Sequence, residues 1–389
     1  MRLNVKQIMT IVATNVYSAV NECRGSLPRT ARPTNEDMRE PMSDRNMVDI
    51  DVLTSWLDRN GIGDGPVTDV VALTGGTQNI LVRFTRNGQS YVFRRPPLHK
   101  RSNSDETMRR EARVLQALAG SDVPHPRLVA SCEDLDVMGC FFFVMESVDG
   151  FTATTEVPEP HVSSLRMQHD MGLSMVDAVA ALGRLDPARL GAEQVARADG
   201  WIERQVGRWR KQLESYHELD GWPGPDLAGI DEIGSWLDAN RPTTWTRGII
   251  HGDYHFGNVM FRRDAAGVAA VVDWELATVG DPLLDLGHLL ATWPNPDEPR
   301  TAGLAKHLDG LPGREESIAR YGAATGRDMT GFDWYQVLAC YRLAVLLEGT
   351  HARACAGKAD AALGQRFHRV SQSLLDQALA LVATSTQTV

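Results

Sequence analysis

The sequence has few cysteines, few lysines and no long apolar run, and each scarcity excludes a class of protein. Its 389 residues include five cysteines, an odd number with no Cys-x-x-Cys pair, which argues against a disulfide framework and a zinc knuckle. No apolar stretch approaches the roughly 18 uninterrupted residues of a membrane span. We therefore expect reduced thiols, a cytoplasmic location and no membrane partner.

The positive charge comes almost entirely from arginine. Of the 40 Lys+Arg residues only five are lysines, namely Lys6, Lys100, Lys211, Lys306 and Lys358, and the formal net charge is −10. After residue 150 there are 31 acids against 22 bases, so no clustered basic excess is present. A nucleic-acid partner would require such a cluster, and we expect none.

The length predicts about two lobes, because 389 residues exceed what one core usually organises. Residues 1–46 are mildly apolar and then rich in Pro, Arg, Thr and Asn, which indicates a poorly structured extension. A weak Arg-rich targeting segment, or a true start at Met42 or Met47, are alternatives. We expect an N-lobe over 47–149 and a C-lobe over 150–389.

Periodicity predicts an α+β N-lobe and a mainly helical C-lobe. In the N-lobe we expect a helix ending at Asn60-Gly61, strands over 67–73, 80–86 and 89–95, a helix over 104–118, and strands over 127–131 and 141–145. Asn87-Gly88 is typical of a type I′ hairpin turn. In the C-lobe we expect helices over 171–182, 198–216, 230–239, 285–290, 332–347 and 363–383, and short β-rich segments over 248–261 and 268–274.

The segment IIHGDYHFGNVMF, residues 249–261, is the strongest chemical signal, together with VVDWE at 271–275. Phosphoryl transfer requires a carboxylate that orients the attacking hydroxyl and oxygen ligands that hold magnesium on the nucleotide phosphates. Asp253 can be the orienting carboxylate, and Asn258 and Asp273 can be the oxygen ligands of magnesium. The flanking apolar strands make this spacing far more specific than H-x-D-x4-N alone.

The strings HGDYHFGN and VVDWELATVGDPLLDLGHL resemble the aminoglycoside phosphotransferase family, whose bilobal, protein-kinase-like fold also contains the choline kinases. The resemblance implies ATP and Mg²⁺ as cofactors, Asp253 as catalytic base, and Asn258 and Asp273 as magnesium ligands. It also implies that His251 shapes the loop. A metal cluster of the H-x-D-x-H kind, made by His251, Asp253 and His255, is a weaker alternative. Asp281 and Asp285 fit helix-capping and loop-bracing roles.

The N-lobe contains candidate nucleotide-binding residues. In LTGGTQNILVRF, Gly75 and Gly76 allow the backbone close to phosphates, and Thr77, Gln78 and Asn79 supply further donors, although a plain hairpin turn is the alternative.

Arg94 in YVFRRPP stands where the family usually has a phosphate-binding lysine, with Glu111 of RREARVLQAL as its expected partner. Arg95 or a purely structural arginine are the alternatives. Arginine is always charged and can bind phosphate through its fork. FFFVMESVDG resembles the hinge whose backbone, at Glu146 and Val148, binds adenine.

YVFRRPP, GWIERQVGRWRKQ and DWELATVGDPLLDLGHLL further resemble the kinase-like domain fused to animal acyl-CoA dehydrogenases. This implies a phosphotransferase acting on a hydroxyl of a small metabolite, such as a hydroxyacyl-CoA. Arg204, Arg208 and Lys211 form a basic stripe that could meet CoA phosphates, or simply a solvated face. A catalytically silent pseudokinase, or an aminoglycoside, amino-alcohol or sugar kinase, are alternatives. Nothing in the sequence indicates ATP over GTP or an oligomeric state.

Overall fold

The computed structural model describes residues 47–73, 79–98, 103–293 and 308–385. These residues form two compact units: 47–119 with 126–148, and 120–125 with 149–385. The smaller unit is built on a five-stranded sheet and the larger is mainly helical, which confirms the expected α+β, bilobal fold. The expected N-terminal extension and residues Gly75 to Gln78 lie outside the described ranges.

The sheet of the smaller unit is antiparallel, with the strand order β1-β2-β3-β5-β4. Its strands are β1 Thr68–Ala72, β2 Ile80–Arg86, β3 Gln89–Arg95, β4 Leu128–Cys132 and β5 Phe142–Glu146. The predicted hairpin between β2 and β3 is present, with both central residues at positive φ, +48° for Asn87 and +71° for Gly88. Positive φ at both positions is what a type I′ turn requires, so the register of β3 is fixed by this dipeptide.

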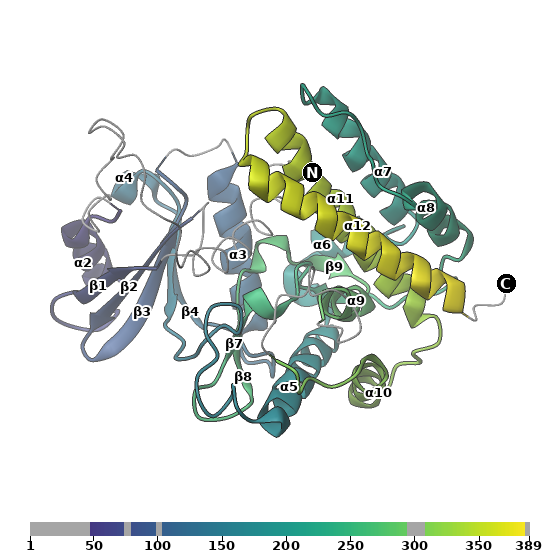
Figure 1. Ribbon diagram of the computed structural model, residues 1–389. Helices are drawn as coiled ribbons and strands as arrows, with labels where there is room; N and C mark the ends of the chain where they lie inside the picture. The colour runs from purple at the N-terminus through teal and green to yellow at the C-terminus, as the bar shows by residue number, and fades with distance from the viewer. Residues whose placement is uncertain (1–46, 74–78, 99–102, 294–307, 386–389) are drawn as a thin grey trace, which may run out of the picture. The chain divides into compact units, whose positions relative to one another are not determined.

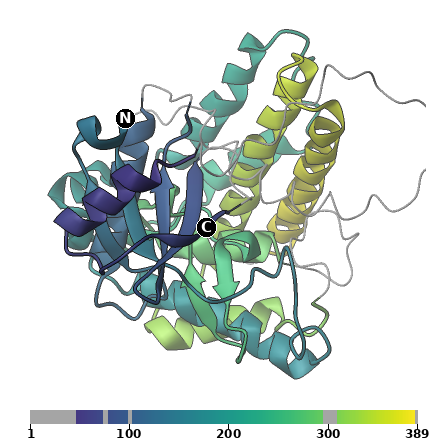
Figure 2. The same cartoon turned by 90° about the vertical axis from the view of Figure 1, so that its left-hand side faces the viewer.

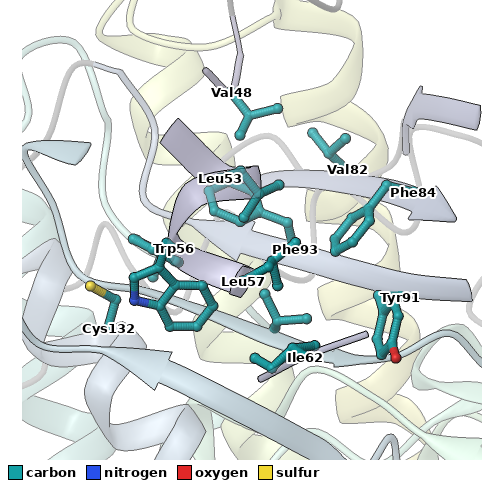
Figure 3. Close-up of a cluster of buried hydrophobic side chains, with 12 residues drawn as sticks. Val48, Leu53, Trp56, Leu57, Ile62, Val82, Phe84, Tyr91, Phe93 and Cys132 are labelled. Atoms are coloured by element: carbon teal, nitrogen blue, oxygen red, sulfur yellow. The ribbon is translucent and has the colours of Figure 1, made fainter. Parts of the chain in front are cut away.

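Alternation along the strands gives this sheet two distinct faces. One face packs against α2, Ile50–Arg59, whose Leu53, Trp56 and Leu57 meet Phe84, Phe93 and Phe142 in a closed apolar cluster (Figure 3). The rings of Trp56 and Phe142 meet edge to face at 4.9 Å. The other face, which carries Val92 and Arg94, is covered by α3, Ser104–Leu118 (Figure 1).

The larger unit is organised around α11, Phe332–Cys355, whose residues are buried on every side from Trp334 to Ala352. Helix α12, Ala361–Thr384, runs beside it as the other arm of a hairpin (Figures 1 and 2). The remaining helices are α4 Leu135–Met138 in the smaller unit and, in the larger, α5 Leu165–Gly183, α6 Ala192–Arg197, α7 Gln205–Glu214, α8 Ile230–Ala239, α9 Leu283–Ala291 and α10 Arg314–Thr325. No helix in the described ranges is long and apolar enough to cross a bilayer.

Two small antiparallel ribbons lie at the centre of the larger unit. β6 Gly248–Ile250 pairs with β9 Thr278–Gly280, and β7 Val259–Phe261 pairs with β8 Val268–Val271. They bear out the expected β-rich segments, and the loop from His251 to Asn258 connects β6 to β7. The expected helix over 198–216 is wrong in extent, because the structure has α7 followed by a 3₁₀ turn, Ser215–Glu218.

Candidate active site

The loop between β6 and β7 is tied to the protein through its backbone. Asp285, fully buried on α9, accepts hydrogen bonds from the amides of His251 and Gly252, at 2.6 Å and 2.9 Å. On the other side, the guanidinium of Arg342 on α11 donates to the carbonyl oxygen of Gly252. The tyrosine hydroxyl of Tyr254 donates to the carbonyl of Met175 on α5 at 2.8 Å. Three helices therefore fix this loop, and the loop-bracing role expected for Asp285 is confirmed.

Asp281 has a similar bracing role at the start of the same helix. Its carboxylate accepts from the amide of Leu283 at 3.0 Å, as a capping residue does, and also from the hydroxyl of Tyr335 at 2.7 Å. Arg327 forms a salt bridge with it. The capping expected for Asp281 is therefore present.

Asp253 is almost fully buried in this loop, with 2% of its surface exposed. The amide nitrogen of Asn258 donates to its backbone carbonyl at 2.9 Å and to its Oδ2 at 3.2 Å. Two imidazoles flank its oxygens: His255 Nε2 lies 3.5 Å from Oδ2, and His288 Nε2 lies 3.5 Å from Oδ1. The carboxylate is thus held in one orientation by three side chains, two from its own loop and one from α9.

The surroundings of Asp253 keep it ionised. Burial alone would raise its pKa, but His255, through its charge and its hydrogen bond, together with His288 and Arg342, holds the pKa below the usual range. Burial lowers the pKa of His288 to about 3, although Asp253 opposes this change. At neutral pH a charged carboxylate therefore lies beside a neutral imidazole.

Asn258 and Asp273 are placed by the same hydrogen-bonded network. The amide of Val272, the residue before Asp273, donates to the carbonyl of Asn258 at 2.9 Å. The carbonyl of Val272 lies 3.0 Å from His251 Nε2, a contact that links the loop to the segment before Asp273. Asp273 itself adopts a left-handed conformation, with φ +67°, where the chain turns from β8 into a 3₁₀ helix, Trp274–Leu276. Such backbone strain in a non-glycine residue is typical of functional sites.

The geometry disfavours the H-x-D-x-H metal cluster. His251 Nδ1 accepts from the amide of Asp253 at 3.2 Å, so both ring nitrogens of His251 are engaged by the backbone. Within the described ranges, the one group of side chains close enough to share a metal ion is Glu348, His351 and His368, on α11 and α12. There, Glu348 already accepts from both imidazoles and from the indole of Trp222, so its charge is satisfied without an ion.

In the smaller unit, Arg94 and Glu111 form the expected pair. Arg94 Nη2 lies 3.0 Å from Glu111 Oε2, and the side chains of both residues are more than nine-tenths buried. Arg95, the alternative phosphate ligand, lies on the opposite face of β3 because neighbouring residues of a strand alternate. Arg94 is therefore positioned by a carboxylate from α3, as the resemblance predicts.

The end of β5 shows how the chain leaves the smaller unit. The amide of Glu146 donates to the carbonyl of Arg127 at 2.9 Å, and the amide of Ser147 donates to the carbonyl of Ser90 at 3.1 Å. Arg127 also forms a salt bridge with the Glu146 carboxylate, at 2.5 Å. Of the backbone groups of Glu146 and Val148 predicted to bind adenine, the Glu146 amide is thus already bonded to Arg127. Asn79 lies just before β2 and is half-buried.

Two residues of this site were missed by the sequence reasoning. His288 and Arg342 lie in α9 and α11, both almost completely buried helices. Arg342 Nη1 also lies 3.4 Å from His288 Nδ1, so the two residues are in contact as well as touching the loop. An ionisable residue within an otherwise apolar helix was the available signal, because burying such a group requires a partner.

Residues 69–321 match the phosphotransferase enzyme family, well over half of the chain, so the protein belongs to this family. Among curated proteins it is similar to acyl-CoA dehydrogenase family member 11 of Gallus gallus, 28% identical over 320 residues, and of Homo sapiens, 27% identical over 319. These matches cover 79% and 81% of this chain and 40% of each relative. The chain thus spans about 40% of the length of these relatives.

Solved structures agree with this assignment. A Ralstonia eutropha protein named as a candidate aminoglycoside phosphotransferase is 27% identical, with a TM-score of 0.72 over 87% of this chain and 99% of that one. A thermostable mutant of aminoglycoside phosphotransferase APH(4)-Ia, in a ternary complex with AMP-PNP and hygromycin B, is 15% identical. Its TM-score is 0.54 over 86% of this chain and 99% of that one, which shows a shared fold. The resemblance drawn from HGDYHFGN and VVDWE is confirmed.

Proposed function

We propose that the protein is an ATP-dependent small-molecule kinase that transfers the γ-phosphate to a hydroxyl group. The observation that carries this proposal is the buried, ionised Asp253, held in one orientation beside Asn258 and the segment that leads into Asp273. In phosphoryl transfer the protein mainly positions groups and stabilises charge, and a fixed carboxylate next to oxygen ligands supplies both. Asp253 would accept the proton of the attacking hydroxyl.

The residues present fit a magnesium ion. Asn258 uses its amide nitrogen to hold Asp253, so its Oδ1 is the atom that would bind a cation, and Asp273 adds a carboxylate. Oxygen donors of this kind suit Mg²⁺, which is usually bound by one or two protein groups together with substrate phosphates. The ion would neutralise charge on the transferred phosphoryl group.

Arg94 is our candidate for the cation that binds the nucleotide phosphates. Glu111 fixes its side chain, and the arginine fork can bind phosphate oxygens while keeping that partner. We assign adenine binding to the Glu146 carbonyl and the Val148 amide. Gly75, Gly76, Thr77, Gln78 and Asn79 complete the proposal as the further phosphate-binding candidates.

The acceptor we favour is a hydroxylated small metabolite, with a hydroxyacyl-CoA as the first candidate. The curated relatives carry acyl-CoA dehydrogenase in their names, and this chain spans about 40% of their length. An aminoglycoside, an amino alcohol or a sugar is the alternative class, supported by the names of the structural relatives. The described cysteines Cys132, Cys140, Cys340 and Cys355 form no disulfide, which fits a reducing compartment such as the cytoplasm.

The test is calorimetric titration of ATP and GTP, with and without magnesium, into the wild type and two variants. Asp253→Asn should bind Mg-ATP like the wild type but lower phosphoryl transfer by about 10²–10⁴-fold, because it removes the base. Asp273→Asn should weaken binding only when magnesium is present. Asp264→Asn, an exposed carboxylate paired with Arg262, is the control for loss of a charge. Mg-ATP binding without transfer to any hydroxyl would favour the pseudokinase alternative, and equal rates in all variants would refute the assigned roles.

A further inference from the structure

Two arginines from different helices contact the same indole ring in the larger unit. Trp209, on α7, is 2% exposed, and the guanidinium of its neighbour Arg208 lies 4.9 Å from the ring centroid. The guanidinium of Arg342, from α11, lies 5.5 Å from the same ring. Cation–π contacts of this kind hold each guanidinium in place without neutralising its charge.

In the part of the chain that the structure describes, Arg208 forms no salt bridge, whereas the guanidiniums of Arg210 and Arg204 are held by oxygen acceptors. Arg210 forms a salt bridge with Asp238 at 2.6 Å. Arg204 donates to the backbone carbonyls of residues 197 and 199. Within the described ranges, no carboxylate lies within salt-bridge distance of Arg208, and the charges that act on it are those of Arg342 and Arg204.

The environment of Arg208 destabilises the charged form of its guanidinium. Its side chain is exposed, yet the surrounding protein desolvates it, and this together with the positive charges of Arg342 and Arg204 lowers its pKa to about 10. A guanidinium that reaches solvent but is partly desolvated among like charges is stabilised by an anion. The arrangement is therefore suited to a ligand.

This pair of arginines is connected directly to the catalytic loop. Arg342 is 6% exposed and donates to the carbonyl of Gly252, the residue before Asp253, so its head is already engaged. Arg208 forms the second cation–π contact with Trp209 and is exposed to solvent. An anion bound by Arg208 would thus be linked through the indole ring of Trp209 to Arg342, the residue that anchors the loop.

We propose that Arg208, backed by Arg342 across Trp209, binds an anionic group of the acceptor, a phosphate or a carboxylate. This inference rests on the proposed kinase function and specifies the class of its acceptor. The fork of Arg208 can bind two oxygens of either group at once. A polycationic acceptor would be repelled by the same pair of charges.

The experiment uses the full chain saturated with AMP-PNP and Mg²⁺, so that probes cannot bind at the nucleotide site. Two matched pairs of probes are titrated by calorimetry: 4′-phosphopantetheine against pantetheine, which lacks its phosphate, and 4-hydroxybutyrate against 4-hydroxybutyramide. The wild type should bind the anionic member of at least one pair tenfold or more tightly than its neutral counterpart. The pair that shows the preference identifies phosphate or carboxylate as the recognised group.

Arg208→Gln should reduce this preference at least tenfold, whereas Arg210→Gln, which removes a charge from the same helix, should leave it unchanged. Equal effects of the two substitutions, or no preference in the wild type, would refute the inference. AMP-PNP binding in the first step separates the two proposals: its absence contradicts the kinase function, while its presence with an unaffected Arg208→Gln contradicts the anion site alone. Unchanged AMP-PNP affinity in both variants verifies that they are folded.

Discussion

Each unit of this protein buries a charged group that we assign to catalysis, but the two groups are stabilised differently. In the smaller unit, Arg94 is paired directly with an opposite charge, Glu111, at 3.0 Å. In the larger unit, the charge of Asp253 is shared by two imidazoles, the amide of Asn258 and, at longer range, Arg342. One site therefore contains a direct pair of opposite charges, and in the other several groups surround one charge.

This difference in how the two charges are stabilised predicts how each site responds to substitution. A buried ion pair is strongly destabilised when one partner is removed, because the other loses its counter-charge. A network loses only a part of its stabilisation, because the remaining donors still solvate the carboxylate. We expect substitutions at the ion pair of the smaller unit mainly to lower the free energy of unfolding. Substitutions in the network of the larger unit should first disturb the orientation of the loop between β6 and β7.

The largest effect should come from breaking the ion pair. Glu111→Gln should lower the free energy of unfolding by about 3–5 kcal/mol, because it leaves Arg94 buried without its counter-charge. The double variant Arg94→Met with Glu111→Leu should recover most of this loss, since an apolar pair of similar volume needs no desolvation of charge. Urea denaturation measures both values, and nucleotide titration should show weak binding in both variants.

Glu106→Gln is the matched control for this experiment. This substitution removes another carboxylate from α3. The Glu106 carboxylate forms an exposed salt bridge with Arg113 at 2.5 Å. Exposed pairs contribute only about 0–1 kcal/mol, so the control should be nearly neutral. If Glu111→Gln is equally neutral, or if the double variant binds nucleotide normally, the role assigned to Arg94 is wrong.

A smaller effect is expected from Asp285→Asn, which weakens one anchor of the network. The amide side chain can accept only one of the two backbone hydrogen bonds, so the substitution should cost about 1–3 kcal/mol of stability. The loop should be less well oriented, and kcat should fall more than nucleotide affinity. Stopped-flow or steady-state kinetics with Asp264→Asn as control measures this, and an unchanged kcat would contradict the bracing role.

The smallest effect concerns pH. The pKa of His288 is lowered to about 3 in the folded protein, against 6.5 for an ordinary histidine, so between these values the unfolded chain binds more protons. Stability should therefore fall as the pH falls from 6.5 towards 3. His288→Gln cannot be protonated and should lose about 1 kcal/mol less than the wild type between pH 6 and 5. Thermal unfolding of the wild type and of His288→Gln at each pH measures this difference in stability, with the exposed His217→Gln as control. Parallel stability profiles of the wild type and His288→Gln would contradict the prediction.

Much of the fold was predictable because local patterns and tertiary packing agree. The strands Ile80–Arg86 and Gln89–Arg95 and the helices Ser104–Leu118 and Ile230–Ala239 have the bounds that the sequence indicates. Helix α10 was not predicted, because only Ser317 and Tyr321 along it are buried and no apolar face marks it. Strand β9 is three residues long, too short to show alternation.

The candidate site was predictable where one short segment contains it and hidden where it does not. Asp253 and Asn258 lie five residues apart in a loop whose flanking strands mark it. Arg342 contacts Gly252 from 90 residues downstream, and only the packing of α11 against α9 brings it there. Arg208 was recognised as part of a basic stripe, but its contact with Trp209, and the partners that neutralise Arg210, required the structure.

The hairpin of α11 and α12 has a consequence for biosynthesis. Helix α11 supplies Arg342 to the catalytic loop, and α12, which lies beside it, covers one of its sides. Until α12 has docked, that side of α11 is exposed, and the incompletely folded chain presents apolar surface that chaperones recognise. We therefore expect the protein to become competent only after Ala361–Thr384 has docked, and a chain without these residues to be inactive and prone to aggregate.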